Sequence, residues 1–210
     1  MPLYKTLNPN SQTTVKIWKI EESFDVLIQP ITLRPESLSR VLSMKSELHQ
    51  RGFLSVRHLL AEFGYTDNDL FYDENGKPHL KDGKHISITH SFTFSGVVVS
   101  DNMVGIDIEK QRDKIGVIAH KFMDYESQYL QKDADDYIRK LTVIWCVKES
   151  LYKLFATPGL SFLKHTLVIP FELVDSETRA WIDYDNNKYG YQTTFLEFEG
   201  FTCAFALPFS

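Results

Sequence analysis

The chain has 210 residues, of which 43% are hydrophobic, 13% aromatic and 24% charged, and its formal net charge is −5. This length and composition allow one large or two small globular domains with a buried core, and they exclude a disordered chain. The acidic balance argues against general nucleic-acid binding, which requires a basic face. Two cysteines predict no disulfide framework, and no apolar run is long enough to span a bilayer. Because the amino terminus lacks the layout of a secretory signal, we expect a soluble, cytoplasmic protein that binds neither nucleic acid nor membrane.

The first third of the chain predicts strands followed by helices. Two short β-rich runs, residues 15–20 and 24–29, are typical of an opening strand pair. Pro35 then occupies a position that proline favours, the first turn of a helix. From there apolar residues recur at steps of three and four as far as Phe63, which predicts one long amphipathic helix or two stacked helices ending near Gly64.

The middle of the chain predicts a β-meander. A turn-rich connector at residues 73–78 precedes it, and its strands are expected at residues 86–90, 94–100 and 103–109. Residues 100–102 are typical of the hairpin turn between the last two of these strands.

The remainder of the chain predicts helices and then strands. Apolar periodicity predicts a helix over residues 115–130 and a stronger one over residues 135–155, and the strands of the tail are expected at residues 166–174, 179–184, 189–198 and 201–207. Because strands and helices come in blocks, we expect the α+β class rather than a doubly wound parallel sheet. A boundary near residue 102 would divide the chain into domains at residues 1–102 and 103–210.

A pair of acidic residues lies in the strand expected at residues 103–109. Asp107 and Glu109 are two positions apart, so both side chains point to the same face, about 6.6 Å apart along the strand. Neighbouring carboxylates repel each other, and a hard divalent cation such as Mg²⁺ relieves that repulsion. The alternative interpretation is a solvated strand end with two exposed charges.

A second cluster lies in the helix expected at residues 135–155. Glu149 and Lys153 are four positions apart and share a helix face with Trp145, whose side chain should be buried. A carboxylate beside a buried tryptophan is a candidate functional group, whereas the alternative is an ordinary surface ion pair.

A histidine between hydroxyl side chains ends the first strand of the meander. Thr89, His90 and Ser91 are a reasonable phosphate-contacting cluster, although a lone histidine more often makes a structural hydrogen bond. The histidines and cysteines show no zinc-ligand spacing, and the glycine-rich phosphate loops of nucleotide-binding proteins are absent from the sequence.

Together, in this order and spacing, these motifs resemble those of the 4′-phosphopantetheinyl transferases, especially the long, pseudo-dimeric type that activates peptide and polyketide synthases. The matching segments are Lys77-Pro78, Ile88-Thr89-His90-Ser91, Gly105-Ile106-Asp107-Ile108-Glu109 and Trp145-x-x-Lys148-Glu149-Ser150-x-x-Lys153. Phe122, followed by Glu126, fits the segment that this family places between its two metal motifs. The resemblance is strong over residues 75–165.

The resemblance implies a fold of two similar α+β halves with the active site in the cleft between them, so a monomer would suffice. It also implies transfer of the phosphopantetheine arm of coenzyme A to a serine of an apo acyl or peptidyl carrier protein, with release of adenosine 3′,5′-bisphosphate. Two alternatives are a metal-dependent phosphohydrolase and a non-catalytic module that docks carriers.

The resemblance also assigns roles to individual residues. Three carboxylates would hold Mg²⁺: Asp107, Glu109 and Glu149. The residues expected to bind coenzyme A are Arg51, Lys77, Thr89, His90 and Lys153. The candidate catalytic residues are Glu149, Lys153 and Glu126, with Glu149 and Glu126 as alternatives for the base that accepts the serine proton.

Overall fold

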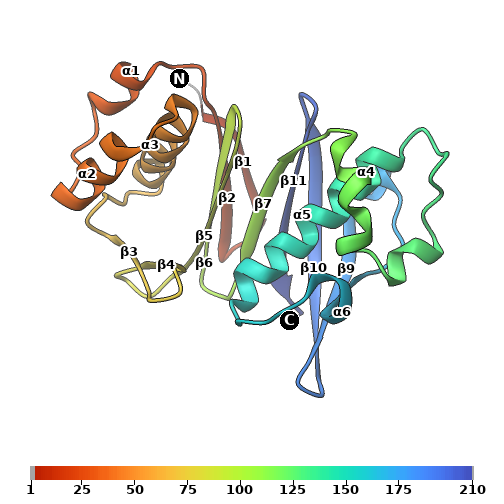
Figure 1. Cartoon of the computed structure of the whole chain (residues 1–210). Coiled ribbons are helices and arrows are strands. Elements are labelled where there is room, and N and C mark those ends of the chain that lie inside the picture. The colour runs from red at the N-terminus through yellow and green to blue at the C-terminus, as the bar shows by residue number, and fades with distance from the viewer. Residues whose placement is uncertain (1–2, 210) are drawn as a thin grey trace. The chain divides into compact units, whose positions relative to one another are not determined.

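The computed structural model describes residues 3–209, which combine helices and strands (Figure 1). The mixture of both kinds of element is confirmed, and every strand pairing among these residues is antiparallel. The chain divides into two compact units, Met1–Asn102 and Met103–Ser210. The expected similarity of two halves, and an active site between them, stay predictions.

The first unit contains a four-stranded sheet in the order β1-β2-β6-β5 and a two-stranded sheet of β3 and β4. Figure 1 shows its helices on one side of the larger sheet. Its elements are β1 (Leu3–Asn10), β2 (Thr13–Lys19), α1 (Phe24–Ile28), α2 (Pro35–Ser43), α3 (Glu47–Glu62), β3 (Leu70–Tyr72), β4 (Pro78–Leu80), β5 (His85–Ser91) and β6 (Phe94–Ser100). In its core, Leu54 and Leu59 of α3 belong to the same hydrophobic cluster as Val97 of β6, and all three side chains are fully buried.

One predicted strand of this unit is wrong. Residues 24–29 contain the short helix α1, in which Leu27 N–H donates to the carbonyl of Ser23 at 3.1 Å and the Leu27 side chain is buried. Burial against the core therefore outweighs the β-propensity of the run. Strand β2 pairs instead with β6 and with β1, a mostly exposed strand without apolar alternation, which the sequence pattern did not reveal.

The long apolar stretch forms two helices, which was one of the two alternatives. The backbone leaves helical geometry at Met44 and Ser46, so α2 ends before α3 begins. The end of α3 agrees with the expected position, because Gly64 follows it with φ +83°, a conformation that favours glycine.

The second unit contains a five-stranded sheet in the order β7-β11-β10-β9-β8. Figure 1 shows α5 lying along one face of this sheet. Its strands are β7 (Gly105–Lys110), β8 (Thr166–Val168), β9 (Glu177–Tyr184), β10 (Asn187–Phe198) and β11 (Phe201–Pro208). Its helices are α4 (Lys114–Ile118), α5 (Tyr137–Phe155) and α6 (Phe162–His165), with 3-10 turns η1 (Ala119–Lys121), η2 (Tyr125–Gln128) and η3 (Leu173–Asp175).

Three predictions for this unit need correction. First, β7 is not the last strand of a meander, since it pairs with β11. Second, the helix expected at residues 115–130 is broken into α4, η1 and η2, and the backbone leaves helical geometry at Phe122, with φ −134°. Third, the strand expected at residues 166–174 ends early, where Pro170 offers no N–H to the sheet.

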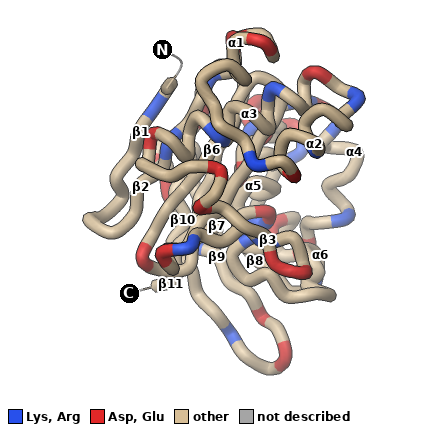
Figure 2. The backbone as a smooth tube through the Cα atoms, turned by 90° about the vertical axis from the view of Figure 1, so that its left-hand side faces the viewer, with Lys and Arg blue, Asp and Glu red and all other residues tan. Residues whose placement is uncertain are grey.

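The cysteines and the charged residues add little to this description of the fold. Cys146 and Cys203 are buried free thiols. In the view of Figure 2, basic and acidic residues are interspersed along the backbone. Among the helices of residues 3–209, none combines the length and hydropathy needed to cross a lipid bilayer.

Candidate active site

Strand β7 carries the predicted acidic pair toward helix α5. Alternation along the strand puts Gly105, Asp107 and Glu109 on one face, while Ile106 and Ile108 are buried on the other. Asp107 is buried, and Lys153 of α5 reaches it across this face, with Nζ 2.7 Å from Oδ1 and 3.0 Å from the Ile106 carbonyl oxygen. Strand and helix therefore meet through an ion pair, which the sequence alone did not predict.

Gly105 sets how closely β7 and α5 approach each other. A Cβ atom at this position would lie 1.9 Å from the carbonyl oxygen of Ser150, so only glycine fits. The Ser150 hydroxyl lies 2.7 Å from the Cys146 carbonyl oxygen and 2.9 Å from that of Ala204 in β11. The absence of a side chain at Gly105 therefore lets the middle of α5 pack closely against β7, and the Ser150 hydroxyl links the helix to β11.

Glu149 has an unusual ionisation. Burial, and then the negative charge of Asp107, raise its pKa to about 7, and Glu109 adds a smaller upward contribution while Lys153 opposes it. The three predicted carboxylates therefore act on one another electrostatically. Glu149 changes charge near neutral pH, as a group that accepts and releases a proton should.

The predicted metal ligands have suitable chemistry but are not gathered in a ligand geometry. Asp107, Glu109 and Glu149 offer only carboxylate oxygens, the donors that Mg²⁺ prefers, and their mutual repulsion is of the kind that a cation relieves. However, among residues 3–209 no group of three or more His, Cys, Asp or Glu side chains is arranged to hold a metal ion. Lys153 instead neutralises Asp107. The metal assignment stays a prediction.

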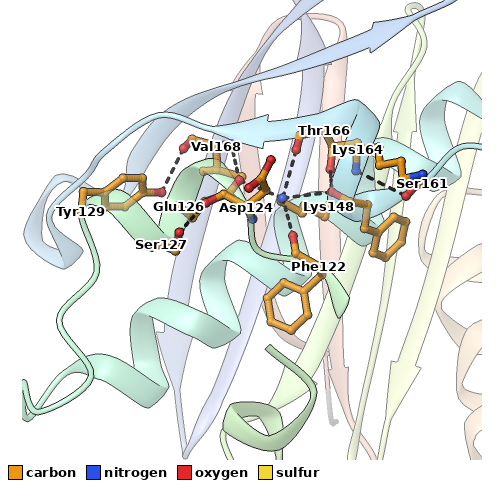
Figure 3. Close-up of polar contacts among 11 residues, drawn as sticks. Phe122, Asp124, Glu126, Ser127, Tyr129, Lys148, Ser161, Lys164, Thr166 and Val168 are labelled. Carbon is orange, nitrogen blue, oxygen red and sulfur yellow. Dashed lines mark hydrogen bonds and ion pairs between the residues drawn. The ribbon is translucent and has the colours of Figure 1, made fainter. Parts of the chain in front are cut away.

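Lys148, next to Glu149 in α5, is fully buried in a cage of oxygens (Figure 3). Its Nζ lies 2.8 Å from Glu126 Oε1, and both side chains have 0% exposure. It also donates to the carbonyl oxygens of Phe122 at 2.6 Å, Thr166 at 3.0 Å and Phe162 at 3.1 Å. Burial lowers the pKa of Lys148, and Glu126 opposes that effect.

Glu126 therefore has a structural environment, which corrects its place among the candidate bases. Besides pairing with Lys148, its Oε1 accepts a hydrogen bond from Val168 N–H at 2.8 Å (Figure 3). A carboxylate with no exposed surface and two donors on one oxygen is not available to a substrate proton in this conformation. Sequence reasoning missed the role of Lys148. The available signal was that Ile144, four positions before it, and Leu151, three positions after it, are apolar and share its helix face; both are fully buried.

The residues expected to bind coenzyme A, apart from Lys153, lie in the first unit. Arg51 lies in the first turns of α3 and donates through Nη2 to the Ile20 carbonyl at 3.1 Å. Next to it, Gly52 packs under the exposed His90, whose Cγ would lie 3.3 Å from a Cβ at Gly52. Thr89 does not share this face: it is buried, and strand alternation turns it away from His90.

Lys77 lies in a different element from Arg51 and His90, the turn between β3 and β4. Its backbone N–H donates to Asp73 Oδ1 at 2.9 Å, and Asp73 Oδ2 pairs with His79 at 3.0 Å. Burial lowers the pKa of the Lys77 amine. This lysine is thus partly desolvated and oriented by its turn, features that suit contact with an anionic ligand.

A cavity of about 170 Å³ opens beside Glu109 in the second unit, and sequence reasoning did not find it. Its lining combines one acidic side chain with cationic and apolar ones: Glu109, Lys110, Arg112, Lys114, Ile115, Ile118 and Trp145. Trp145 also packs edge-on against Phe122, with ring centroids 5.0 Å apart. Trp145, which was expected to be buried, is only partly buried.

Comparison with known proteins adds an independent observation. Residues 103–206 match the family model described as the 4′-phosphopantetheinyl transferase superfamily, and this range covers β7 and α5. Enterobactin synthase component D of Salmonella typhimurium is 32% identical over 125 residues, which are 56% of this chain and 53% of the relative. The 4′-phosphopantetheinyl transferase gsp of Aneurinibacillus migulanus is 28% identical over 169 residues, 76% of this chain and 68% of the relative. The match thus spans about half the length of the Salmonella protein.

Proposed function

We propose that this chain transfers the 4′-phosphopantetheine arm of coenzyme A to a serine of an apo acyl or peptidyl carrier protein, because its residues 103–206 match the model of the 4′-phosphopantetheinyl transferase superfamily. Adenosine 3′,5′-bisphosphate is the other product. The observation that supports this most is the meeting of Asp107, Glu149 and Lys153 between β7 and α5.

Lys153 supplies the positive charge for the reacting phosphate. Attack of a serine oxygen on a pyrophosphate phosphorus places negative charge on the surrounding oxygens, so a fixed cation lowers the barrier. Asp107 and the Ile106 carbonyl hold the Lys153 ammonium in place, and about a quarter of the side chain, 28%, is exposed to meet a substrate.

Glu149 is the base in this proposal. Burial and the charge of Asp107 raise the pKa of Glu149 to about 7 in the metal-free protein; a bound Mg²⁺ would lower that pKa and keep the carboxylate ionised as a proton acceptor. It would take the proton from the serine hydroxyl as the new phosphate ester forms. Glu126, the alternative base, is enclosed with Lys148 and has no exposed surface.

Asp107, Glu109 and Glu149 are the residues that would hold Mg²⁺ in this proposal. Bound there, the ion would neutralise charge on the pyrophosphate oxygens of coenzyme A. Arg51, Lys77 and His90 are proposed to bind the phosphates and nucleotide of coenzyme A; the buried Thr89 is the weakest member of that set.

The experiment is incubation of the protein with coenzyme A, Mg²⁺ and an apo carrier, followed by mass spectrometry of the carrier. We expect the carrier to gain one phosphopantetheine, and a carrier without its acceptor serine to gain nothing. Unmodified carriers from both the acyl and the peptidyl class would refute the proposal. Phosphate released from coenzyme A without any carrier would favour a phosphohydrolase instead.

A further inference from the structure

Glu197, in β10, joins three elements of the second unit with one carboxylate. Its Oε1 accepts hydrogen bonds from Gln111 Nε2 at 2.6 Å and from Arg139 Nε at 2.9 Å, and Arg139 Nη2 donates to Oε2. Gln111 directly follows β7, and Arg139 lies in the first turn of α5. The carboxylate therefore connects the end of the acidic strand to the start of the helix that carries Glu149.

Gln111 is held at three points next to Glu109. Its Nε2 also donates to Thr202 Oγ1 at 3.0 Å, and its backbone N–H donates to the Gly200 carbonyl at 2.9 Å. Thr202 is the cross-strand partner of Glu109 in the pairing of β7 with β11. The Gln111 side chain is thus hydrogen-bonded both to Glu197 and to Thr202, the cross-strand neighbour of Glu109.

This network is the second polar connection between α5 and the β7 segment. The first is Lys153 with Asp107, toward the carboxyl end of the helix. Arg139 and Lys153 lie roughly four turns apart on α5. Two polar connections this far apart supplement the packing of α5 and help to define its direction across the strand.

The same network sets a wall of the cavity beside Glu109. The chain continues from Gln111 directly into Arg112 and Lys114, which line that cavity together with Trp145 of α5. Any loosening of Gln111 would move these cations relative to Glu109. The position of this cavity wall therefore depends on how firmly Gln111 is held.

We propose that Glu197 is a positioning residue: without touching substrate, it fixes Glu109 and the cavity wall at Arg112 relative to Glu149 by holding Gln111 and Arg139 together. The functional part of this inference rests on the proposed transferase activity. The Arg139 side chain is 50% exposed and that of Glu197 21%, so the ion pair contributes little to the free energy of unfolding. Its loss should change local geometry more than global stability.

The test compares Glu197→Ala with a matched control, Glu172→Gln. Glu172 pairs with Lys140, the neighbour of Arg139 on α5, and it is mostly exposed. Hydrogen exchange of the intact protein should become at least about fivefold faster over residues 111–118 in Glu197→Ala and stay unchanged in Glu172→Gln. The kcat for carrier modification should fall about tenfold or more, with KM for coenzyme A within about twofold, because a misplaced group weakens the transition state more than the bound substrate.

A second variant and a coupled pair separate the possible outcomes. Arg139→Gln keeps the bond from Gln111 and removes the helix connection, so it should reproduce the loss of kcat even if Glu197→Ala folds poorly. Gln111→Ala combined with Glu197→Ala should cost less than the sum of the two single losses, since both remove the contact between Gln111 and Glu197. Unchanged exchange over residues 111–118 in Glu197→Ala, or unchanged kcat in a folded Arg139→Gln, overturns the inference. A wild-type protein that modifies no carrier refutes the transferase activity instead, and the exchange result still decides the anchoring.

Discussion

Replacing Gly105 with alanine tests the close approach between β7 and α5 directly. The added Cβ would lie 1.9 Å from the Ser150 carbonyl oxygen and 3.1 Å from Leu154 Cβ, whereas real Cβ atoms stay beyond 3.0 Å. Backbone on both sides must therefore separate by about 1 Å or more, a change that in packed interiors costs about 1–3 kcal/mol.

The same separation would pull Glu149 and Lys153 away from Asp107. A displacement of about 1 Å of a catalytic group lowers the rate by about a hundredfold, so we expect a loss of carrier modification on that scale and a lower unfolding temperature. Transfer is measured by mass spectrometry of the carrier, and unfolding by calorimetry in the same buffer.

Two companion variants keep this test interpretable. Gly116→Ala in α4 is the matched control, because its Cβ would meet only Ile138 Cδ1 at an ordinary 3.7 Å. Ser150→Ala removes the hydroxyl contacts to Cys146 and Ala204 and leaves the steric room intact, so it should cost stability with a smaller effect on rate. A Gly105→Ala protein with wild-type stability and turnover would show that the helix position does not depend on this glycine.

Three further variants test individual charges. Glu149→Gln should stabilise the protein at pH 8 by up to about 3 kcal/mol in the absence of divalent cations, and by much less at pH 5: the raised pKa means that the fold favours the protonated acid, so the penalty grows as the pH rises through 7. Calorimetry at both pH values measures it, and equal gains would contradict the pKa argument. Lys148→Met should destabilise by about 3–5 kcal/mol in urea unfolding, since it leaves Glu126 buried without its cation, and adding Glu126→Gln should recover much of the loss. Lys153→Met should lower turnover by about a hundredfold or more while circular dichroism stays native; normal turnover would remove Lys153 from the mechanism.

The local pattern of the sequence was sufficient for much of the fold and part of the site. Alternation around Asp107 and Glu109 predicted a strand there, and the periodicity up to Phe155 predicted the long helix that became α5. Both follow from the side-chain periods of strand and helix, which depend only on neighbours in the chain. The ion pair between Lys153 and Asp107 was not predicted from the sequence, and the roles of both residues in a site stay predictions.

Other features were decided by contacts between distant segments. The helix at Phe24–Ile28 forms because its apolar residues are buried in the core of the first unit, against the preference of the local sequence. The local sequence does not show that Lys148 and Glu126 are buried together, but carbonyl groups from three other segments surround the lysine. The hydrogen bonds that Gln111 and Arg139 donate to Glu197 likewise join residues far apart in the chain. Sequence periodicity determines which face of an element is apolar, whereas burial of a charge and the choice of its partner arise only when the folded chain removes water from around it.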